Sequence, residues 1–214
     1  MLTQSQGRLE CVDGPVILIL TPLSIEYEGL KPALRDREEV LLAVGGHGKV
    51  QFALTTLHLI QKHSPHLVIC AGACGALAPW LKVADVVVAT TTIEHDYKLR
   101  FVQRPLPTFD GEGRVLEKLK TKTSWRNFKL HLGPIASGDE DIVDAGMARD
   151  LHARTGALAV AWEGAGGARA CRFTKIPYLE LRAVTDLANE QSMRNFAEAI
   201  GQAMINLGQV LNCI

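Results

Sequence analysis

The segment ALAVAWEGAGGARACRFTKIPYLELRAVTDLAN spans residues 157–189 and predicts a strand, a glycine- and alanine-rich helix and a second strand. Glu163 comes just past the end of the first predicted strand, and Asp186 just past the end of the second. Ligands collect outside the carboxyl ends of strands in open α/β sheets, so a βαβ unit would bring both carboxylates to one edge. The segment therefore predicts a candidate active site. The alternative interpretation is structural, with Glu163 as a first-turn acid on the helix dipole and Asp186 as a helix cap.

The composition is that of a chain that folds into a globular domain. Its 214 residues are 47% hydrophobic and 21% charged, which excludes the disordered and fibrous classes. A chain of this length buries roughly 70% of its unfolded surface, so we expect a single domain over residues 1–214. Basic and acidic side chains balance at 23 each, so no global charge attracts nucleic acid or an acidic membrane. We expect neither as a partner.

The cysteines and the apolar runs indicate a cytoplasmic protein. The five cysteines form no CxxC pair, and Cys70, Cys74 and Cys171 lie in apolar or small-residue runs typical of packed free thiols. No apolar run reaches the roughly 18 residues that cross a membrane, and the opening MLTQSQGRLE lacks the apolar core of a signal peptide. We therefore expect a reducing, cytoplasmic setting.

The other apolar segments predict an α/β fold. Buried strands are predicted at VILILT, VLLAV, LVIC and VVVAT, which begin at residues 16, 40, 67 and 86. A helix follows the first strand from Leu23, and Pro32 is expected to end it. Small-residue loops are predicted after the second strand, at GGHG (45–48), and after the third, at AGACGALAP (71–79). The last helix carries an apolar stripe that should cover the sheet: Phe196, Ile200, Met204, Leu207 and Leu211.

The glycine-rich loops carry no nucleotide motif. GGHG lacks the lysine and the spacing of a phosphate-binding loop, and AGACGA lacks the GxGxxG pattern. The histidines show no paired metal spacing and no GxSxG elbow is present, so we expect no metal, no cofactor and no serine hydrolase. What remains is three acids at predicted strand ends, Glu26, Glu163 and Asp186. Such acids suit cleavage of a glycosidic bond, because one carboxyl protonates the leaving group while another activates water.

Five blocks of the sequence, in order, resemble the nucleoside phosphorylase and nucleosidase superfamily. They are GGHGKVQFALTTLHLI (45–60), VICAGACGALAPWLKVADVVVATTTIEHD (68–96), GPIASGDEDIV (133–143), VAWEGAGGARAC (160–171) and PYLELRAVTDLANE (177–190). Within that superfamily the chain is most similar to the 5'-methylthioadenosine/S-adenosylhomocysteine nucleosidases. The resemblance implies a three-layer α/β fold with a twisted mixed central sheet flanked by helices. It also implies a homodimer that cleaves the N-glycosidic bond of a purine nucleoside.

The resemblance implies a role for each of the three acids. Asp186, in AVTDLA, matches the family acid that protonates N7 of the leaving purine. Glu163, in AWEGAG, matches the acid that binds the ribose hydroxyls. Glu26, in PLSIEYE, matches the residue that holds and activates the attacking water.

The same likeness implies which segments surround the substrate. Backbone groups near Ile142 match those that contact the purine edge. The predicted loop over residues 72–75, which contains Ala73 and Gly75, matches the border of the sugar and the water. A nucleoside is therefore the expected small-molecule partner.

Phosphorolysis is the main alternative to hydrolysis. Hexameric phosphorylases carry an RVGSCGA-like block whose Arg and Ser or Thr reach the phosphate, whereas CAGACGA has Cys70 and Ala73 at those places. Ser24 and Glu26 occupy the stretch where phosphorylases offer an arginine, and a carboxylate close to a phosphate is repulsive. These differences favour hydrolysis. A third interpretation is a catalytically weak nucleoside-binding or sensing module.

Three residues depart from the nucleosidase pattern. Asp141, in GDED, takes the place of an aromatic residue that stacks on adenine, a contact worth about 1–3 kcal/mol in base stacking elsewhere. Trp162 replaces a methionine, and it either restores an aromatic face or fills the pocket. His47 stands where an apolar residue lines the 5' pocket, so it is either a packing residue or part of a polar 5' subsite with Lys98 and Arg100. The second interpretation predicts a substrate with a more polar 5' side than methylthioadenosine, a nucleotide included.

Overall fold

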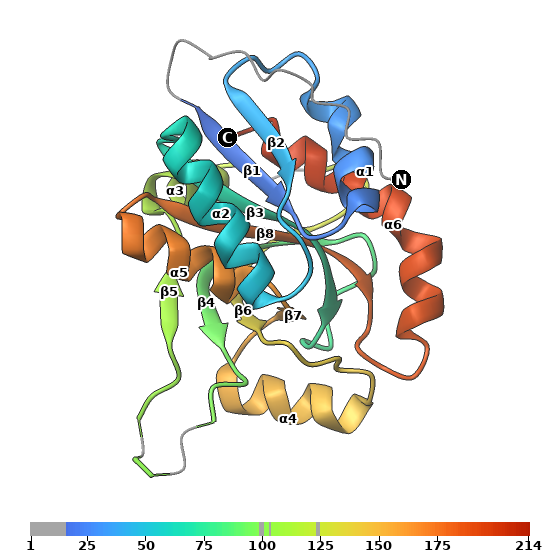
Figure 1. Cartoon of the computed structure of the whole chain (residues 1–214). Helices are drawn as coiled ribbons and strands as arrows, with labels where there is room; N and C mark the ends of the chain where they lie inside the picture. Colours follow the sequence, from blue (N-terminus) through green and yellow to red (C-terminus); the bar gives the residue numbers. More distant parts are fainter. Residues whose placement is uncertain (1–15, 99–100, 103, 123–124) are drawn as a thin grey trace, which may run out of the picture.

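The computed structural model describes residues 16–98, 101–102, 104–122 and 125–214 (Figure 1). Residues 1–15, which include the opening MLTQSQGRLE, and Arg100 lie outside the described residues. The strands are β1 (Ile17–Thr21), β2 (Val40–Val44), β3 (Leu67–Ala76), β4 (Val86–Glu94), β5 (Thr108–Asp110), β6 (Leu130–Ser137), β7 (Ala159–Ala161) and β8 (Tyr178–Asp186). The helices are α1 (Ser24–Leu34), α2 (Lys49–His63), α3 (Gly113–Lys120), α4 (Ala145–Thr155), α5 (Gly164–Thr174) and α6 (Ser192–Leu211).

The sheet is mixed and closes partly on itself. β2, β1, β3 and β8 lie side by side in parallel, and β8 then pairs with β4 in antiparallel. β4 is parallel to β6, β6 is parallel to β7, and β7 pairs back to β3 in antiparallel. β3, β8, β4, β6 and β7 therefore form a closed ring, from which β1 and β2 extend as an open wing and β5 pairs with the outer side of β4. The predicted mixed central sheet is confirmed.

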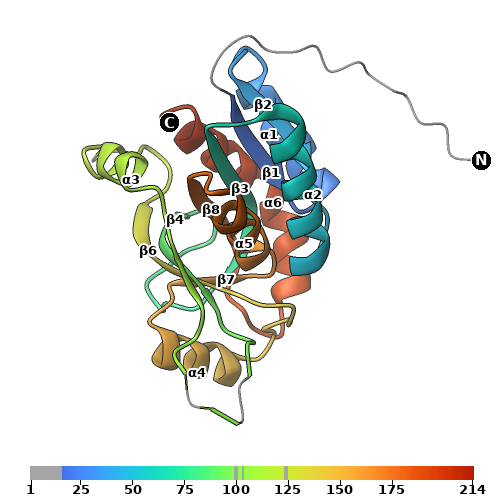
Figure 2. The same ribbon diagram turned by 60° about the vertical axis from the view of Figure 1, so that its left-hand side comes forward.

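Helices cover both faces of the sheet, which confirms the three-layer α/β architecture. The apolar run of β1 explains why both faces are covered, because alternate side chains of a strand point to opposite sides. Ile17 and Ile19 pack into a cluster with α6, whereas Leu18 and Leu20 pack into a cluster with α2 and α5. Four of the five predicted stripe residues of α6 are buried, and Phe196 is partly buried. Both views place α4 at the end of the molecule far from β2 (Figures 1 and 2).

The segment predicted as a small-residue loop after LVIC is part of β3, so that prediction is wrong. β3 runs through to Ala76 because its small residues let other groups approach the strand backbone. A Cβ atom on Gly72 would lie 2.7 Å from Oε1 of Glu26, and one on Gly75 would lie 3.1 Å from Oδ1 of Asp186. The glycines thus bring two of the candidate acids directly against the strand.

The expectation of a parallel βαβ unit over residues 157–189 is also wrong. β7 runs antiparallel to β3 while β8 runs parallel to it, so the two strands of the unit run in opposite directions. They still meet at one place, because Gly75 pairs with Val160 on one side and with Asp186 on the other. The register shifts between Cys74 and Gly75, which leaves one extra residue in β8 just before Asp186 and turns the strand end.

Smaller expectations have mixed outcomes. α1 continues to Leu34, so Pro32 does not end it; a proline two residues from the end of a helix costs little of the hydrogen-bond ladder. Cys70, Cys74 and Cys171 are buried free thiols, as predicted. Within the described ranges, no helix combines the length and the apolar character that crossing a bilayer demands.

Candidate active site

One cavity of about 210 Å³ collects the three acids and six other residues that the sequence placed in the site. It opens at the carboxyl ends of β1, β3 and β8, where the sheet begins to close into its ring. Its lining includes Glu26, His47, Ala73, Gly75, Asp141, Ile142, Trp162, Glu163 and Asp186. Residues from at least six segments of the chain therefore meet in one place, although each was proposed separately.

Glu26 is buried in the first turn of α1, with its carboxylate turned toward β3. Oε2 accepts a hydrogen bond from the backbone N–H of Leu23 at 2.8 Å, and Oε1 accepts one from the N–H of Ala73 at 2.7 Å. Burial raises the pKa of Glu26 to about 7, although the N–H of Ala73 and the charge of Arg182 act against the rise. A carboxyl with that pKa exchanges a proton near neutral pH, which suits a general base.

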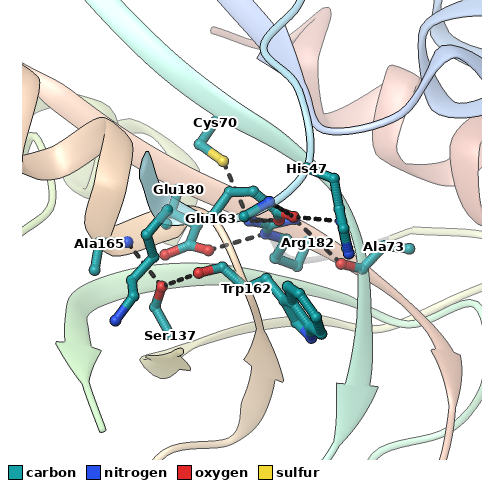
Figure 3. Close-up of polar contacts among 12 residues, drawn as sticks. His47, Cys70, Ala73, Ser137, Trp162, Glu163, Ala165, Glu180 and Arg182 are labelled. Atoms are coloured by element: carbon teal, nitrogen blue, oxygen red, sulfur yellow. Dashed lines mark hydrogen bonds and ion pairs between the residues drawn. The ribbon is translucent and has the colours of Figure 1, made fainter. Parts of the chain in front are cut away.

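Arg182 lies behind the cavity and holds its acids together (Figure 3). The guanidinium is 1% exposed, and it donates from Nε to Glu180 at 2.9 Å and from Nη2 to Oε2 of Glu163 at 3.4 Å. Nη2 also contacts Sγ of Cys70 at 3.2 Å, and Nη1 donates to the carbonyl of Ala73 at 3.3 Å. Among the described residues, one N–H of Nη1 is left without an acceptor, so it can donate to a bound water or ligand.

Glu163 is the N-cap residue of α5, but its side chain makes no cap hydrogen bond. Its place at the start of the helix agrees with the interpretation of an acid on the helix dipole, whereas its side-chain contacts lie elsewhere. Its Oε1 instead contacts Nδ1 of His47 at 3.1 Å and the N–H of Gly48 at 3.3 Å. Ser137 fixes the turn, because its hydroxyl donates to the carbonyl of Trp162 at 2.7 Å and accepts from the N–H of Ala165 at 2.8 Å (Figure 3).

His47 and Trp162 form a stacked pair in the cavity wall. Their ring centroids are 4.2 Å apart and their planes are inclined by 25°. The His47 side chain is 55% exposed, so one edge faces solvent while the other contacts Glu163. His47 therefore packs on Trp162 and also lines the cavity, and its role in a polar 5' subsite stays a prediction.

Asp186 is anchored by the loop that leads into α6. Its Oδ1 accepts hydrogen bonds from the N–H of Ala188 at 2.9 Å and the hydroxyl of Ser192 at 2.8 Å. Oδ2 accepts from the hydroxyl of Thr185 at 3.1 Å. The N-cap of α6 is Gln191, so the interpretation of Asp186 as the cap is wrong. Oδ2 carries fewer partners than Oδ1 and is the oxygen better able to hold a transferable proton.

The opposite wall contains Asp141 and Ile142. In the described part of the chain, neither the N–H nor the C=O of Ile142 has a hydrogen-bond partner, so both are available to the edge of a flat ligand. The adjoining Asp139 accepts from the N–H of Lys49 at 2.8 Å. Nζ of Lys49 in turn contacts Asp96 at 2.5 Å, and Asp96 accepts from the N–H of Asp139 at 2.9 Å. This network ties the loop of His47 to the loop of Ile142.

The structure does not place Lys98 with His47. Lys98 lines an adjoining cavity of about 500 Å³ together with Arg104 and Arg154, and that cavity shares Glu140 and Ile142 with the first. Arg100 lies outside the described residues. The prediction that Lys98 joins His47 in an anionic 5' subsite is therefore wrong. The lysine follows β4, whereas His47 follows β2, and these segments reach different cavities.

Several residues in or behind the cavity escaped the sequence analysis. Arg182 and the fully buried Glu180 lie in a strand that reads as an apolar run, and Phe196 was assigned only to the covering stripe of α6. A signal was present for two of them, because Glu180 and Arg182 are charged residues two positions apart in a buried strand. Buried charges at that spacing share a face of the strand and must be paired.

Comparisons with known proteins agree with the fold. The family model described as the phosphorylase superfamily matches residues 28–213. The 5'-methylthioadenosine/S-adenosylhomocysteine nucleosidase of Staphylococcus haemolyticus is 33% identical over 177 residues, which cover 78% of this chain and 77% of that protein. The nucleosidase of the same name from S. pneumoniae, solved with a transition-state inhibitor, superimposes with a TM-score of 0.83 at 27% identity, covering 92% of this chain and 96% of that one.

A futalosine hydrolase of Helicobacter pylori has a similar fold. It superimposes with a TM-score of 0.84 over 93% of this chain and 96% of that one, and it is 23% identical. At that identity the likeness extends to the fold alone. The family match and the nucleosidase relatives lead to one conclusion: the chain belongs to the phosphorylase superfamily, alongside the 5'-methylthioadenosine/S-adenosylhomocysteine nucleosidases.

Proposed function

We propose that the protein hydrolyses the N-glycosidic bond of an adenine nucleoside and releases the free base and a ribose derivative. The observation that carries the proposal is that Glu26, Glu163 and Asp186 line one cavity of about 210 Å³ in a chain related to nucleosidases. Cleavage of such a bond needs an acid for the leaving base, a base for water and an anionic partner for the sugar. Each acid is held in a different environment, which suits three separate roles.

Asp186 protonates the leaving base in this mechanism. A proton on Oδ2 passes to N7 of the purine as the bond from C1' to N9 lengthens, so the base leaves neutral. The sugar then develops the positive charge of an oxocarbenium ion. Ile142 supports the geometry from the base side, because its free N–H and C=O can pair with the purine edge. The contacts of Oδ1 with Ala188 and Ser192 fix the direction of the carboxyl group.

Glu163 binds the ribose and offsets its positive charge. A carboxylate has about four acceptor positions. Contacts with His47, Gly48 and Arg182 occupy three of them, so one remains for a ribose hydroxyl. The charge of Glu163 then lies beside the sugar in a site of low dielectric, where it stabilises a cationic transition state.

Glu26 activates the attacking water. Its ionised carboxylate takes a proton from water as the oxygen attacks C1', and the remaining N–H of Arg182 Nη1 can orient the same water. Because Glu26 acts in its ionised form, we expect kcat/KM to fall as the pH drops through about 7. Burial raises the pKa of Glu26, and that pKa sets the pH below which the protein loses its base for water.

The charges that line the cavity favour water over phosphate as the nucleophile. Five acids line the cavity, namely Glu26, Glu140, Asp141, Glu163 and Asp186. Among the described lining residues Arg182 is the one guanidinium, and its charge is shared with buried carboxylates. A phosphate dianion in this cavity would be repelled by the five acids more strongly than Arg182 attracts it.

Hydrolysis is tested by chromatography of a panel of nucleosides and nucleotides, with and without phosphate. We expect free adenine and free sugar at a rate that phosphate does not change. A requirement for phosphate, with formation of a sugar 1-phosphate, would establish a phosphorylase instead. Binding by thermal shift without base release from any member of the panel would establish a binding module.

The 5' side of the substrate is proposed to be polar and uncharged. His47 brings a ring nitrogen to the cavity wall, whereas the five acids disfavour a 5' phosphate. Replacing His47 with isoleucine should lower the ratio of kcat/KM for adenosine to that for methylthioadenosine by about tenfold, the size of one lost polar contact. His58→Ile, on the exposed face of α2, is the control. An unchanged ratio, or a wild-type preference for the thioether or for AMP, contradicts the proposal.

The proposal extends to a cytoplasmic homodimer. Apolar side chains beside the cavity are exposed, including Val143 at 49% and Met147 at 40%, which is typical of a surface that another chain covers. The buried free thiols of Cys70, Cys74 and Cys171 suit a reducing compartment.

A further inference from the structure

Glu180 is a buried carboxylate that the proposed mechanism does not use. It is 0% exposed in the middle of β8, two residues before Arg182 on the same face of the strand. Oε1 accepts from Nε of Arg182 at 2.9 Å (Figure 3). Oε2 accepts from the hydroxyl of Thr92 at 2.5 Å. Both oxygens therefore have donors. These contacts lower the pKa of Glu180, although burial outweighs them and raises that pKa overall.

The carboxylate of Glu180 occupies space that a side chain at position 164 would need. A Cβ atom on Gly164 would lie 2.1 Å from Oε2 and 2.3 Å from Oε1 of Glu180, which no side chain can tolerate. Gly164 is the first residue of α5, directly after Glu163. The helix that positions Glu163 therefore begins with glycine because Glu180 fills the space.

Three carboxylates compete for one cation in this part of the site. Arg182 contacts Glu163 and Glu180 directly, and its charge also lowers the pKa of Glu26, which burial raises. If all three carboxylates are ionised, the group carries a net charge of −2 although each of its four residues is at most 3% exposed. Charge that Arg182 shares with Glu180 is not available to stabilise an ionised Glu26.

We propose that Glu180 is a positioning residue: it anchors the Arg182 guanidinium through Nε and, by competing for its charge, sets the acid limb of the pH profile. The inference rests on the proposed function, in which Glu26 is the base. Glu180 does not touch the cavity; it acts through Arg182. The groups that face Glu26 or Arg182 from the surrounding elements are His47, Cys70, Cys74, Glu163, Glu180 and Asp186.

The variant that tests the inference is Glu180→Gln. Glutamine has the same shape, its carbonyl can accept from Nε of Arg182, and its amide can donate to the hydroxyl of Thr92. It removes only the negative charge, which frees the charge of Arg182 for Glu26 and favours the ionised form of Glu26. We therefore expect the acid limb of kcat/KM to move to lower pH by about one unit.

Two further variants separate this effect from a general loss of charge or of packing. Asp85→Asn removes a carboxylate of similar burial that pairs with His131, outside the cavity, and should leave the acid limb in place. Thr92→Val removes the hydroxyl that donates to Glu180 while the side chain at position 92 keeps its size. It should move the acid limb to lower pH, by less than Glu180→Gln does. The inference is overturned if Glu180→Gln leaves the limb unchanged, or if Asp85→Asn moves it equally.

A second measurement does not depend on turnover. The carboxyl carbon of Glu26 can be titrated by ¹³C NMR in the full chain, with Glu26→Gln used to assign the signal. We expect Glu26 to titrate at lower pH in Glu180→Gln and in Thr92→Val than in the wild type. Equal titration in all three proteins overturns the inference even if the enzyme is active. Absence of base release from every nucleoside overturns the proposed function and leaves this titration as the test of Glu180.

Discussion

Replacing Asp186 with asparagine should reduce kcat for adenine release by about a thousandfold, within the range that loss of a general acid gives. An amide cannot deliver a proton to N7, so the purine would have to leave as an anion. The fold should persist, because the amide oxygen can keep the contacts of Oδ1 with Ala188 and Ser192. The amide nitrogen then meets the hydroxyl of Thr185, which can accept from it.

The measurement is the rate of base release under saturating nucleoside, with thermal melting to verify the fold. Asp144→Asn is the matched control, because Asp144 caps α4 outside the cavity and asparagine is an equally good cap. It should retain full activity. Full activity of Asp186→Asn would show that another group protonates the base.

Replacing Glu26 with glutamine should also reduce kcat/KM by about a thousandfold at pH 8, because the amide cannot take a proton from water. The pH profile supplies a sharper result. The wild type should lose activity as the pH falls through about 7, whereas the residual activity of Glu26→Gln should show no acid limb at that pH. A limb that stays in place would assign it to a different group.

This variant needs a stability control. In Glu26→Gln one carboxylate oxygen becomes an NH₂ group, which faces the N–H of Leu23 or of Ala73, donor against donor. An unmatched buried donor costs about 1–3 kcal/mol. The melting temperature should therefore be measured, and kcat compared only at temperatures where both proteins are folded.

The periodic elements of the fold and the three acids of the site could be predicted from the sequence. β1 was readable because a buried strand flanked by helices is apolar at every position, and Ile17–Thr21 is buried throughout. Glu26, Glu163 and Asp186 were found because each follows an apolar run, which marks the end of a strand. Both signals are local, so neighbouring residues suffice to read them.

The rest depends on contacts between distant segments. The closed ring arises from the pairing of β3 with β7 and of β4 with β8, and no periodicity specifies which strands meet. The stacking of His47 on Trp162 joins two loops that are remote in the chain. Likewise, the glycines of β3 indicate a loop until it is known that Glu26 lies against Gly72. Small residues indicate that some group lies close to the backbone, but they do not indicate which group it is.

The fit between Gly164 and Glu180 constrains how this protein can change. While Glu180 is present, every other residue at position 164 places a Cβ atom on its carboxylate. A side chain at position 164 therefore requires the Glu180 carboxylate to shift or a smaller residue at position 180. The effects of substitutions at the two positions should depend on one another, so that Gly164→Ala is tolerated better in a chain that also carries Glu180→Ala.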